Sequence, residues 1–348
     1  MIAAGPALTH PAEGVTLFVR GFGMDRRQMM AAAAAALAGM AGPAAGAGRA
    51  RFNPRNLEGV WDLGSYTELE RPPGVDHLVL TPAEAEAYEA PRRAMHGMLP
   101  GKPTEVGQVE NEWTDRGEGL TRIKGQIRAS TVIDPPDGQI PYRPEMMALA
   151  GGRGPALSAA GDLDNPETMG GTTRCMATVA SGAPILGAPD ANVVQFVQTK
   201  DALAIVSEKY HDVRIVRLCP DARAAAAMPR DPPAWMGTSA GWWEGDTLAV
   251  RTDSFHTGIM AKGQRVLISG ATRVAERFTR ISPAEVLYAF TVEDPKLLTR
   301  PWRGETVIHA AKGPLFEYAC HEGNYSMAGM LAGARREERE AAEGRLSR

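Results

Sequence analysis

Alternating apolar and polar positions mark the second half of the chain. The clearest example runs over residues 286–293, where the even-numbered positions are Val286, Tyr288, Phe290 and Val292. Side chains two positions apart lie on the same face of a strand, so these four share one face. The residues between them become more polar along the segment. This pattern predicts a strand that packs one face against a core.

Short segments of this kind recur between turn residues. We predict eight strands, at residues 193–198, 203–208, 213–218, 247–252, 272–281, 286–292, 306–310 and 315–320. Most connections between neighbours are too short for a crossover helix, which favours antiparallel pairing. Strands without helical partners close or stack, because an open sheet exposes its edges. We therefore predict a mostly β fold in which an antiparallel meander closes into a lipocalin-like barrel, with a β-sandwich as the alternative.

Further elements precede these strands. Residues 57–63 predict an opening strand, and residues 120–133 predict another. Between them, a Thr-Pro-Ala-Glu run is typical of a helix start, in which Thr81 and Glu84 form a capping box. We expect this short N-terminal helix to run to about Arg93.

A C-terminal helix and two long loops complete the expected fold. Residues 97–120 and 144–192 are rich in Gly and Pro and predict loops. Asn324 is the expected N-cap of the C-terminal helix, and residues 341–348 form a charged tail. The helix carries an apolar side that we expect to dock, made of Met327, Met330, Leu331 and Ala334.

The amino-terminal segment has the parts of a secretory signal. Paired Arg26 and Arg27 precede an Ala-rich apolar run and a stretch of small residues. Twin arginines favour the export route that carries folded proteins. We therefore interpret residues 24–47 as a twin-arginine-type signal peptide and residues 1–23 as an over-extended gene start. A single β-rich domain is expected at residues 48–340.

Composition and charge narrow the class of protein. The chain has 348 residues, 44% hydrophobic and 23% charged, which excludes a disordered or membrane-embedded chain. The formal net charge of −3 offers no positive field for a phosphate backbone, so we expect no nucleic-acid partner. After the signal, no apolar run reaches the about 18 residues that cross a bilayer. We expect a soluble periplasmic protein with no membrane span, and the oligomeric state stays open.

Whether the cysteines are bridged depends on the redox state of the compartment in which the protein folds. The chain has three, Cys175, Cys219 and Cys320. An oxidising compartment favours one bridged pair and one remaining thiol, and spacing alone does not choose the pair. None lies in a Cys-x-x-Cys arrangement, which disfavours a thioredoxin-like site and a cysteine-rich zinc site.

The strongest candidate site lies at the end of the last predicted strand. If residues 315–320 form a strand, Glu317 and His321 lie on one face. A carboxylate beside an imidazole orients the ring and raises its basicity, as a general base requires. The alternative is a structural histidine. We predict three catalytic residues, His321, Glu317 and Glu322.

Other polar residues suggest a binding site at a barrel mouth. His211 lies in a predicted turn at residues 209–212 that Glu208 and Arg214 flank. Glu208 and His211 with His321 would supply three metal ligands. No His-x-His or His-Glu-x-x-His spacing supports such a site, and we predict no metal. Glu276 and Arg280 share a strand face and form either an ion network or a clamp for a substrate carboxylate. The predicted substrate-binding residues are Glu208, His211, Arg214, Glu276, Arg280, Trp302, Tyr318 and Tyr325.

Three longer motifs carry a resemblance to a known group of proteins. Trp-Glu-Gly-Asp-Thr-Leu begins at Trp243, Glu-Arg-Phe-Thr-Arg at Glu276, and Glu-Tyr-Ala-Cys-His-Glu-Gly-Asn-Tyr at Glu317. Over about residues 55–340, the chain resembles a widespread, uncharacterised group of secreted bacterial proteins. The resemblance implies secretion and implies no particular activity.

The resemblance also bears on the cysteines. In the similar proteins, an Arg-Cys segment, here at Cys175, occurs together with an Ala-Cys-His-Glu segment, here at Cys320. This implies a disulfide between these two residues. Cys219 falls where the group usually lacks a cysteine, so it is expected to be the free thiol.

These observations favour a periplasmic small-molecule enzyme. No nucleophile elbow, Walker motif or dinucleotide glycine pattern is present, and we predict no cofactor. We expect acid–base chemistry of the lyase, isomerase or hydrolase type on a small organic ligand. The alternatives are a lipocalin-like binding or carrier protein without catalysis and a structural envelope protein. The enzyme prediction requires a closed hollow with His321 on its inner wall.

Overall fold

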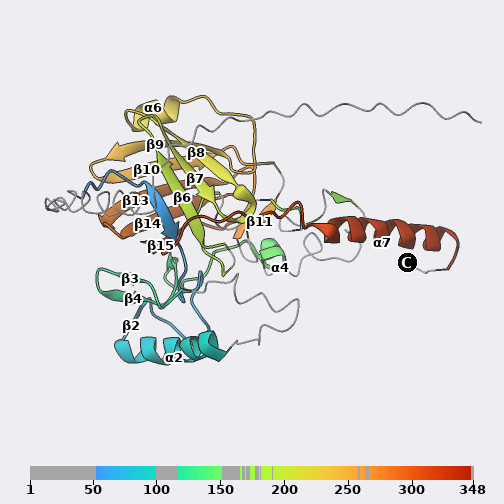
Figure 1. The fold of residues 1–348 in the computed structure, drawn as a ribbon, viewed down its shortest axis with the longest axis horizontal. Helices are drawn as coiled ribbons and strands as arrows, with labels where there is room; N and C mark the ends of the chain where they lie inside the picture. The colour runs from blue at the N-terminus through green and yellow to red at the C-terminus, as the bar shows by residue number, and fades with distance from the viewer. Residues whose placement is uncertain are drawn as a thin grey trace, which may run out of the picture. The chain divides into compact units, whose positions relative to one another are not determined.

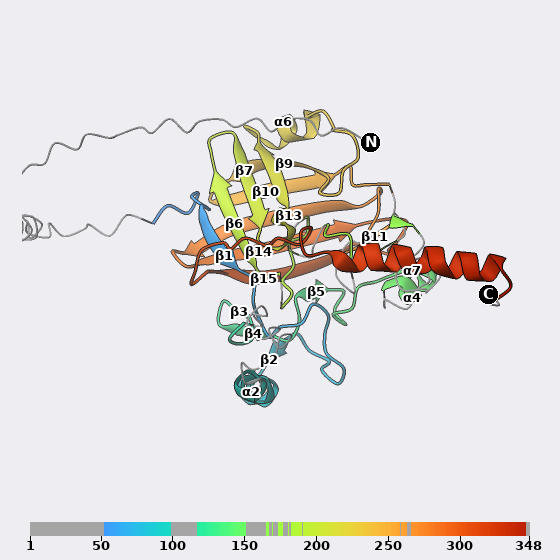
Figure 2. The same cartoon turned by 45° about the vertical axis from the view of Figure 1, so that its right-hand side comes forward.

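A computed structural model gives the fold of most of the chain after residue 51 (Figures 1 and 2). The predicted signal peptide at residues 24–47, the segment 1–23 and much of both predicted long loops lie outside the described residues. The structure describes residues 52–98, 117–150, 165–166, 169, 173–176, 180, 182–189, 191–257, 259–262 and 266–345.

Nine strands close into a barrel. Their order is β1, β6, β7, β8, β9, β10, β13, β14 and β15, and β1 pairs with β15 to complete the ring. The predicted closed barrel is therefore confirmed, and the sandwich alternative is not formed. The strand bounds are β1 Gly59–Asp62, β6 Val193–Gln198, β7 Ala202–Ser207, β8 Val213–Leu218, β9 Thr238–Glu244, β10 Thr247–Asp253, β13 Arg273–Ser282, β14 Glu285–Glu293 and β15 Trp302–Ala310.

One pair of barrel strands departs from the predicted antiparallel meander. β8 and β9 run parallel, with Val216 opposite Ser239, and the other neighbouring pairs of the ring are antiparallel. The connection between them is long enough to return along the barrel, and it contains helix α6, Ala222–Ala227. β9 is absent from the predicted strands because small residues such as Ala240 and Gly241 weaken its β pattern.

Side chains fill the interior of the barrel. The four alternating residues of β14 are at most 3% exposed, as predicted. Aromatic rings continue across the core from Trp61 to Phe196, Phe278 and Tyr288, with successive centroid distances of 6.3, 5.8 and 4.8 Å. These rings occupy the space in which a ligand-sized hollow was expected. Within the described residues, the interior is a packed core.

Two segments cover the ends of the barrel. At one end, the chain that precedes β1 crosses the opening. Leu57 in this segment is fully buried, its N–H donates to Gln198 Oε1 at 2.7 Å, and its carbonyl accepts from Trp61 Nε1 at 2.9 Å. At the other end, the segment that leads into β6 places Ile185 in the core, where its N–H donates to the Tyr288 hydroxyl at 2.8 Å.

The strand predicted at residues 120–133 is broken into three short strands. These are β3 (Arg122–Ile123), β4 (Gln126–Arg128) and β5 (Val132–Asp134). Lys124 and Gly125 turn the chain between β3 and β4 with φ angles of 51° and 78°, a conformation that glycine adopts without steric cost. β4 pairs with β3 and with β2, Val79–Leu80, while β5 pairs with β15.

The predicted capping box opens helix α2, Pro82–Met98. The Thr81 N–H donates to Glu84 Oε2 at 2.8 Å, and the Glu84 N–H donates to Thr81 Oγ1 at 3.3 Å. The helix includes Pro91 and continues past the predicted end at Arg93. The remaining short elements are η1 Pro144–Met146, α4 Met147–Ala150, η3 Lys209–His211, β11 Met260–Lys262 and β12 Val266–Ile268.

The prediction of a strand at residues 315–320 is wrong. After β15 ends at Ala310, residues 311–324 contain no strand, and we call this segment the strap. The cause is closure of the barrel. β15 already pairs with β14 on one side and with β1 and β5 on the other, so it offers no free edge to a further strand.

The predicted C-terminal helix follows the strap. Helix α7 spans Tyr325–Ala342, and Asn324 Oδ1 accepts the Met327 N–H at 3.3 Å, which confirms Asn324 as the N-cap. The expected apolar side is only half-buried, and no residue of α7 is buried, so the expected docking is not seen. None of the helices in the described part of the chain is long and apolar enough to cross a bilayer.

Candidate functional site

The three predicted catalytic residues lie on the strap. His321 and Glu322 belong to a turn near its end, Glu317 precedes this turn, and all three side chains are exposed. Because the strap is not a strand, the alternation expected to place Glu317 beside His321 does not apply. Their catalytic role stays a prediction from the sequence.

Two predicted binding residues hold the strap against the barrel. Glu208 and His211 lie in the turn between β7 and β8. Glu208 Oε2 accepts the Phe316 N–H at 2.9 Å, and His211 Nε2 accepts the Tyr318 N–H at 3.0 Å. The rings of Tyr318 and Tyr210 meet edge to face at a centroid distance of 5.7 Å. The structure thus brings three of the predicted residues, Glu208, His211 and Tyr318, together as a structural contact.

The contact with the strap determines which ring nitrogen of His211 could bind a metal ion. A ring nitrogen that accepts a backbone N–H carries no proton, so the neutral ring holds its proton on Nδ1. The Nε2 lone pair is therefore already used and does not face a metal. In the part of the chain that the structure describes, no three His, Cys, Asp or Glu side chains gather closely enough to hold a metal ion.

Two further predicted residues pair inside the barrel. Arg214 on β8 donates to both carboxylate oxygens of Glu276 on β13, with NH1–Oε2 and NH2–Oε1 distances of 2.7 and 3.0 Å. The Tyr288 hydroxyl donates to Glu276 Oε1 at 2.8 Å. Arg214 and Glu276 are each 1% exposed. Glu276 therefore pairs with Arg214 across the core, and the expected pairing with Arg280 is not formed.

The network shifts the pKa values of the Arg214 guanidinium and the Tyr288 hydroxyl. Burial acts to lower the pKa of the Arg214 guanidinium, but the charge and hydrogen bonds of Glu276 outweigh burial and raise that pKa. Burial also raises the pKa of the Tyr288 hydroxyl well above its usual value, and the Glu276 charge acts in the same direction. The hydroxyl therefore keeps its proton and remains a donor to the carboxylate. The network is inaccessible and pairs the Arg214 guanidinium with the Glu276 carboxylate, while Arg214 Nε is buried with no hydrogen-bond partner in the described part of the chain. The network is part of the core.

The other predicted binding residues lie in different surroundings. Arg280 lies at a barrel end, where its guanidinium donates to the carbonyls of Asn56 and Pro283. Trp302 belongs to β15 and is 1% exposed, so it packs the core and does not offer a surface for stacking. Tyr325 is 82% exposed at the start of α7. These side chains form no common site.

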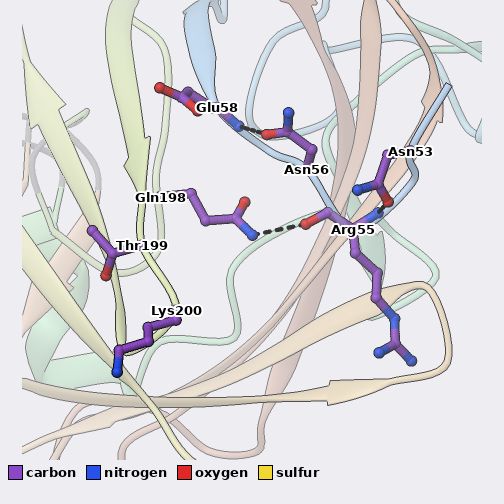
Figure 3. Close-up of a pocket in the computed structure, with 7 residues that line it drawn as sticks. All are labelled: Asn53, Arg55, Asn56, Glu58, Gln198, Thr199 and Lys200. Carbon is purple, nitrogen blue, oxygen red and sulfur yellow. Dashed lines mark hydrogen bonds between the residues drawn. The ribbon is translucent and has the colours of Figure 1, made fainter. Parts of the chain in front are cut away.

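A pocket at the end of the barrel was not anticipated from the sequence (Figure 3). It lies between the segment that leads into β1 and the turn between β6 and β7, and its volume is about 380 Å³. This is within the size range of small-molecule sites. The side chains that line it are all polar: Asn53, Arg55, Asn56, Glu58, Gln198, Thr199 and Lys200.

Hydrogen bonds hold both walls of the pocket. Gln198 links them, because its Oε1 accepts the Leu57 N–H at 2.7 Å and its Nε2 donates to the Arg55 carbonyl at 2.8 Å. Arg55 Nε also donates to the Gly245 carbonyl in the β9–β10 turn at 2.8 Å. Asn53 and Asn56 are residues typical of tight turns, and this was the only signal of the pocket in the sequence. The pocket is therefore held by fixed turns at the rim of a packed barrel.

The cysteines are arranged as the resemblance implied. Cys175 and Cys320 form a disulfide, and Cys219 is free. Cys320 lies on the strap, so the disulfide and the turn at Glu208 and His211 both hold this segment. A disulfide is consistent with an oxidising compartment.

The fold and its pocket define a closed, filled β-barrel with a polar site at one end. No family model matches the chain, and neither the curated proteins nor the solved structures contain a match.

Proposed function

We propose that this protein is a small-molecule binding or carrier protein that holds its ligand in the polar pocket at the barrel end. The observation that carries the proposal is the pocket itself, which is of ligand size and is lined by polar side chains from two fixed walls (Figure 3). The site differs from that of a lipocalin-like barrel because the ligand would sit at the rim and not in the interior.

The packed barrel supports a binding function at its rim. Among the described residues, aromatic rings and the buried Arg214–Glu276 pair occupy the barrel interior, which favours a ligand site at the rim. A rigid framework keeps polar groups in place before the ligand arrives, which lowers the entropy that binding costs. The β6–β7 and β9–β10 turns and the lead into β1 meet at this end, so the pocket is assembled on strand ends of that framework.

Export to the periplasm is part of the proposal. It is supported by the twin-arginine pattern at Arg26 and Arg27 and by the Cys175–Cys320 disulfide. A binding protein in this compartment would take up its ligand after folding.

A ligand screen with a blocked pocket tests the binding function. We expect at least one compound from a panel of neutral, anionic and cationic metabolites to raise the melting temperature, since a ligand at a hundredfold excess over its Kd adds about 2.7 kcal/mol of stability. Lys200→Trp places a large ring in the pocket and is expected to abolish that rise. Lys296→Trp, on an exposed position outside the pocket, is the matched control.

Two results would contradict the binding function. One is the absence of any stabilising compound at millimolar concentration. The other is a compound that stabilises the Lys200→Trp variant as much as the Lys296→Trp control.

The same experiment separates a carrier from an enzyme. A carrier returns its ligand unchanged, so mass spectrometry of the recovered compound is expected to find no product. Product formation that is lost in His321→Ala would support the acid–base prediction in place of the carrier. Product formation that survives in His321→Ala would remove His321 as the catalytic residue.

A further inference from the structure

We infer that the barrel-end pocket selects a small hydroxylated organic anion, such as a sugar acid. The inference rests on the proposed binding function and adds the chemical class of the ligand. It follows from which polar groups of the pocket are already used by the protein and which are left for a ligand.

The amide oxygens of the pocket are used by the backbone. Asn53 Oδ1 accepts the Arg55 N–H at 3.0 Å, and Asn56 Oδ1 accepts the Glu58 N–H at 2.9 Å. Because each amide oxygen must face a backbone N–H, the orientation of both amides is fixed, and each side chain presents its NH₂ group to the surroundings. Both asparagines thus act toward a ligand as donors.

Two other lining residues are fully engaged. Gln198 uses its oxygen and its nitrogen to join the two walls. Thr199 Oγ1 accepts the N–H groups of Asp201 and Ala202 and donates to the Ala202 carbonyl. Gln198 and Thr199 therefore shape the pocket and have little left to offer a ligand.

The charged residues leave an excess of donors. Arg55 Nε donates to the Gly245 carbonyl and also lies 3.8 Å from Asp246 Oδ1, in an ion pair between two exposed side chains. The two terminal nitrogens of Arg55 take part in neither contact. Lys200 pairs only loosely with Asp201, at 3.8 Å between two side chains that are 90% and 79% exposed. Exposed pairs of this kind are worth little and yield to a better partner. Among the described residues, Glu58 supplies the only carboxylate of the lining.

The remaining groups match one class of ligand. The two asparagine NH₂ groups, the Arg55 guanidinium and the Lys200 ammonium favour an acceptor-rich anion. The Glu58 carboxylate accepts a hydrogen bond and repels a second negative group, so it favours a hydroxyl on the same ligand. A molecule with one carboxylate and several hydroxyl groups satisfies both requirements.

Calorimetry with D-glucuronate and D-glucose tests the inference in the full-length exported protein. These probes have closely similar rings, and only the first carries a carboxylate. We expect D-glucuronate to bind at least about tenfold more tightly than D-glucose, the factor that one charge-assisted hydrogen bond supplies. The difference should shrink as the salt concentration rises, because the interacting groups are exposed.

Asn56→Asp gives a sharp second test. An aspartate keeps the oxygen that accepts the Glu58 N–H, so the turn is retained, but it replaces the donor NH₂ by a negative oxygen. We expect the melting temperature to stay close to that of the wild type and D-glucuronate binding to weaken about tenfold or more. Gln126→Glu on β4, an exposed amide-to-acid change outside the pocket, is the matched control.

The outcomes separate the ligand class from the binding function. Equal binding of D-glucose and D-glucuronate, or unchanged D-glucuronate binding in Asn56→Asp, would overturn the anion inference while leaving the pocket as a binding site. Binding of neither probe would also overturn the inference. The proposed function would fail only if the metabolite panel, too, contained no ligand blocked by Lys200→Trp.

Discussion

Glu276 is a polar residue at a position that strand alternation assigns to the core. It shares a face of β13 with Phe278, and its carboxylate meets Arg214 from a strand that lies far away in the sequence. The sequence singled out both residues as binding residues and kept an ion network with Arg280 as an alternative for Glu276. It did not pair Glu276 with Arg214, because the partner of a buried charge is set by the closure of the barrel and not by local spacing. Alternation alone could have predicted the burial of Glu276 but not its partner.

Breaking the buried pair is expected to destabilise the fold strongly. Glu276→Gln leaves the Arg214 charge without a counter-charge in the core, and we expect the free energy of unfolding to fall by about 3–5 kcal/mol. Replacing both residues together, as in Arg214→Met with Glu276→Leu, is expected to recover much of the loss. Chemical denaturation measures both effects. A loss under about 1 kcal/mol for Glu276→Gln would show that the pair is not isolated from solvent.

The elements of the barrel differ in how far the sequence predicts them. β6, β8 and β14 follow their predicted ranges closely, because each alternates over its full length. β9 escapes prediction, and the segment at 315–320 looks like a strand but lies in the strap. Both failures come from strand pairing. A segment with a weak β pattern, such as β9, forms a strand where a neighbouring strand offers a free edge. A segment with a strong β pattern, such as residues 315–320, stays irregular where no neighbouring strand has a free edge.

The start of helix α2 makes a pH-dependent contribution to stability. Hydrogen bonds from the Thr81 side chain and backbone lower the pKa of Glu84 from 4.5 to about 2. A carboxylate whose pKa is lower in the folded state stabilises the fold above its unfolded pKa, and this contribution is lost as the pH falls toward the folded value. The stability difference between the wild type and Glu84→Gln should therefore be fully present at about pH 5.5–6 and should shrink toward pH 2. At higher pH the difference should fall again in part, because hydrogen bonds to Asp76 and Glu84 raise the pKa of His77 and the Glu84 contribution is lost as His77 loses its proton.

Denaturation between pH 2 and pH 6 checks this expectation. Thr81→Val supplies the control, because removing the hydroxyl removes the largest cause of the shift. In that background, Glu84→Gln should change the pH profile less. A stability difference that stays the same at every pH would rule out a capping role for the ionised carboxylate.

At the scale of the whole molecule, the disulfide encloses nearly all of the barrel. It joins residues 145 positions apart, Cys175 before β6 and Cys320 after β15. In the chain-entropy account, a link across so long a loop stabilises mainly by restricting the unfolded chain. We expect Cys175→Ser with Cys320→Ser to lower the free energy of unfolding by about 2–5 kcal/mol.

Denaturation of the oxidised protein measures this loss. Cys219→Ser is the matched control, because Cys219 is free and its loss breaks no covalent link. Similar losses in the double variant and in the control would mean that the effect comes from packing of the sulfur atoms and not from the cross-link.

The closed barrel could be predicted at this scale, but the pocket could not. The sequence predicts barrel closure because it contains many short strands and few helices to cover them, and an open sheet would leave its edges exposed. The pocket depends on how the lead into β1 crosses the barrel end, and the only sequence signal was a pair of turn-forming asparagines, Asn53 and Asn56. The exposed positions of His321, Glu317 and Glu322 follow from the strap, which the sequence presented as a strand.

The barrel closes where β1, the first strand of the ring in the sequence, pairs with β15, the last. We call this pairing the seam, and it places Trp61 opposite Ala310. During synthesis, this pairing cannot form until the ribosome has made almost the entire domain, so the facing edges of β1 and β15 stay unpaired until then. Pairings this distant along a chain form slowly. If the protein is exported as we propose, the twin-arginine route, which carries folded proteins, would require this pairing to be complete before transport.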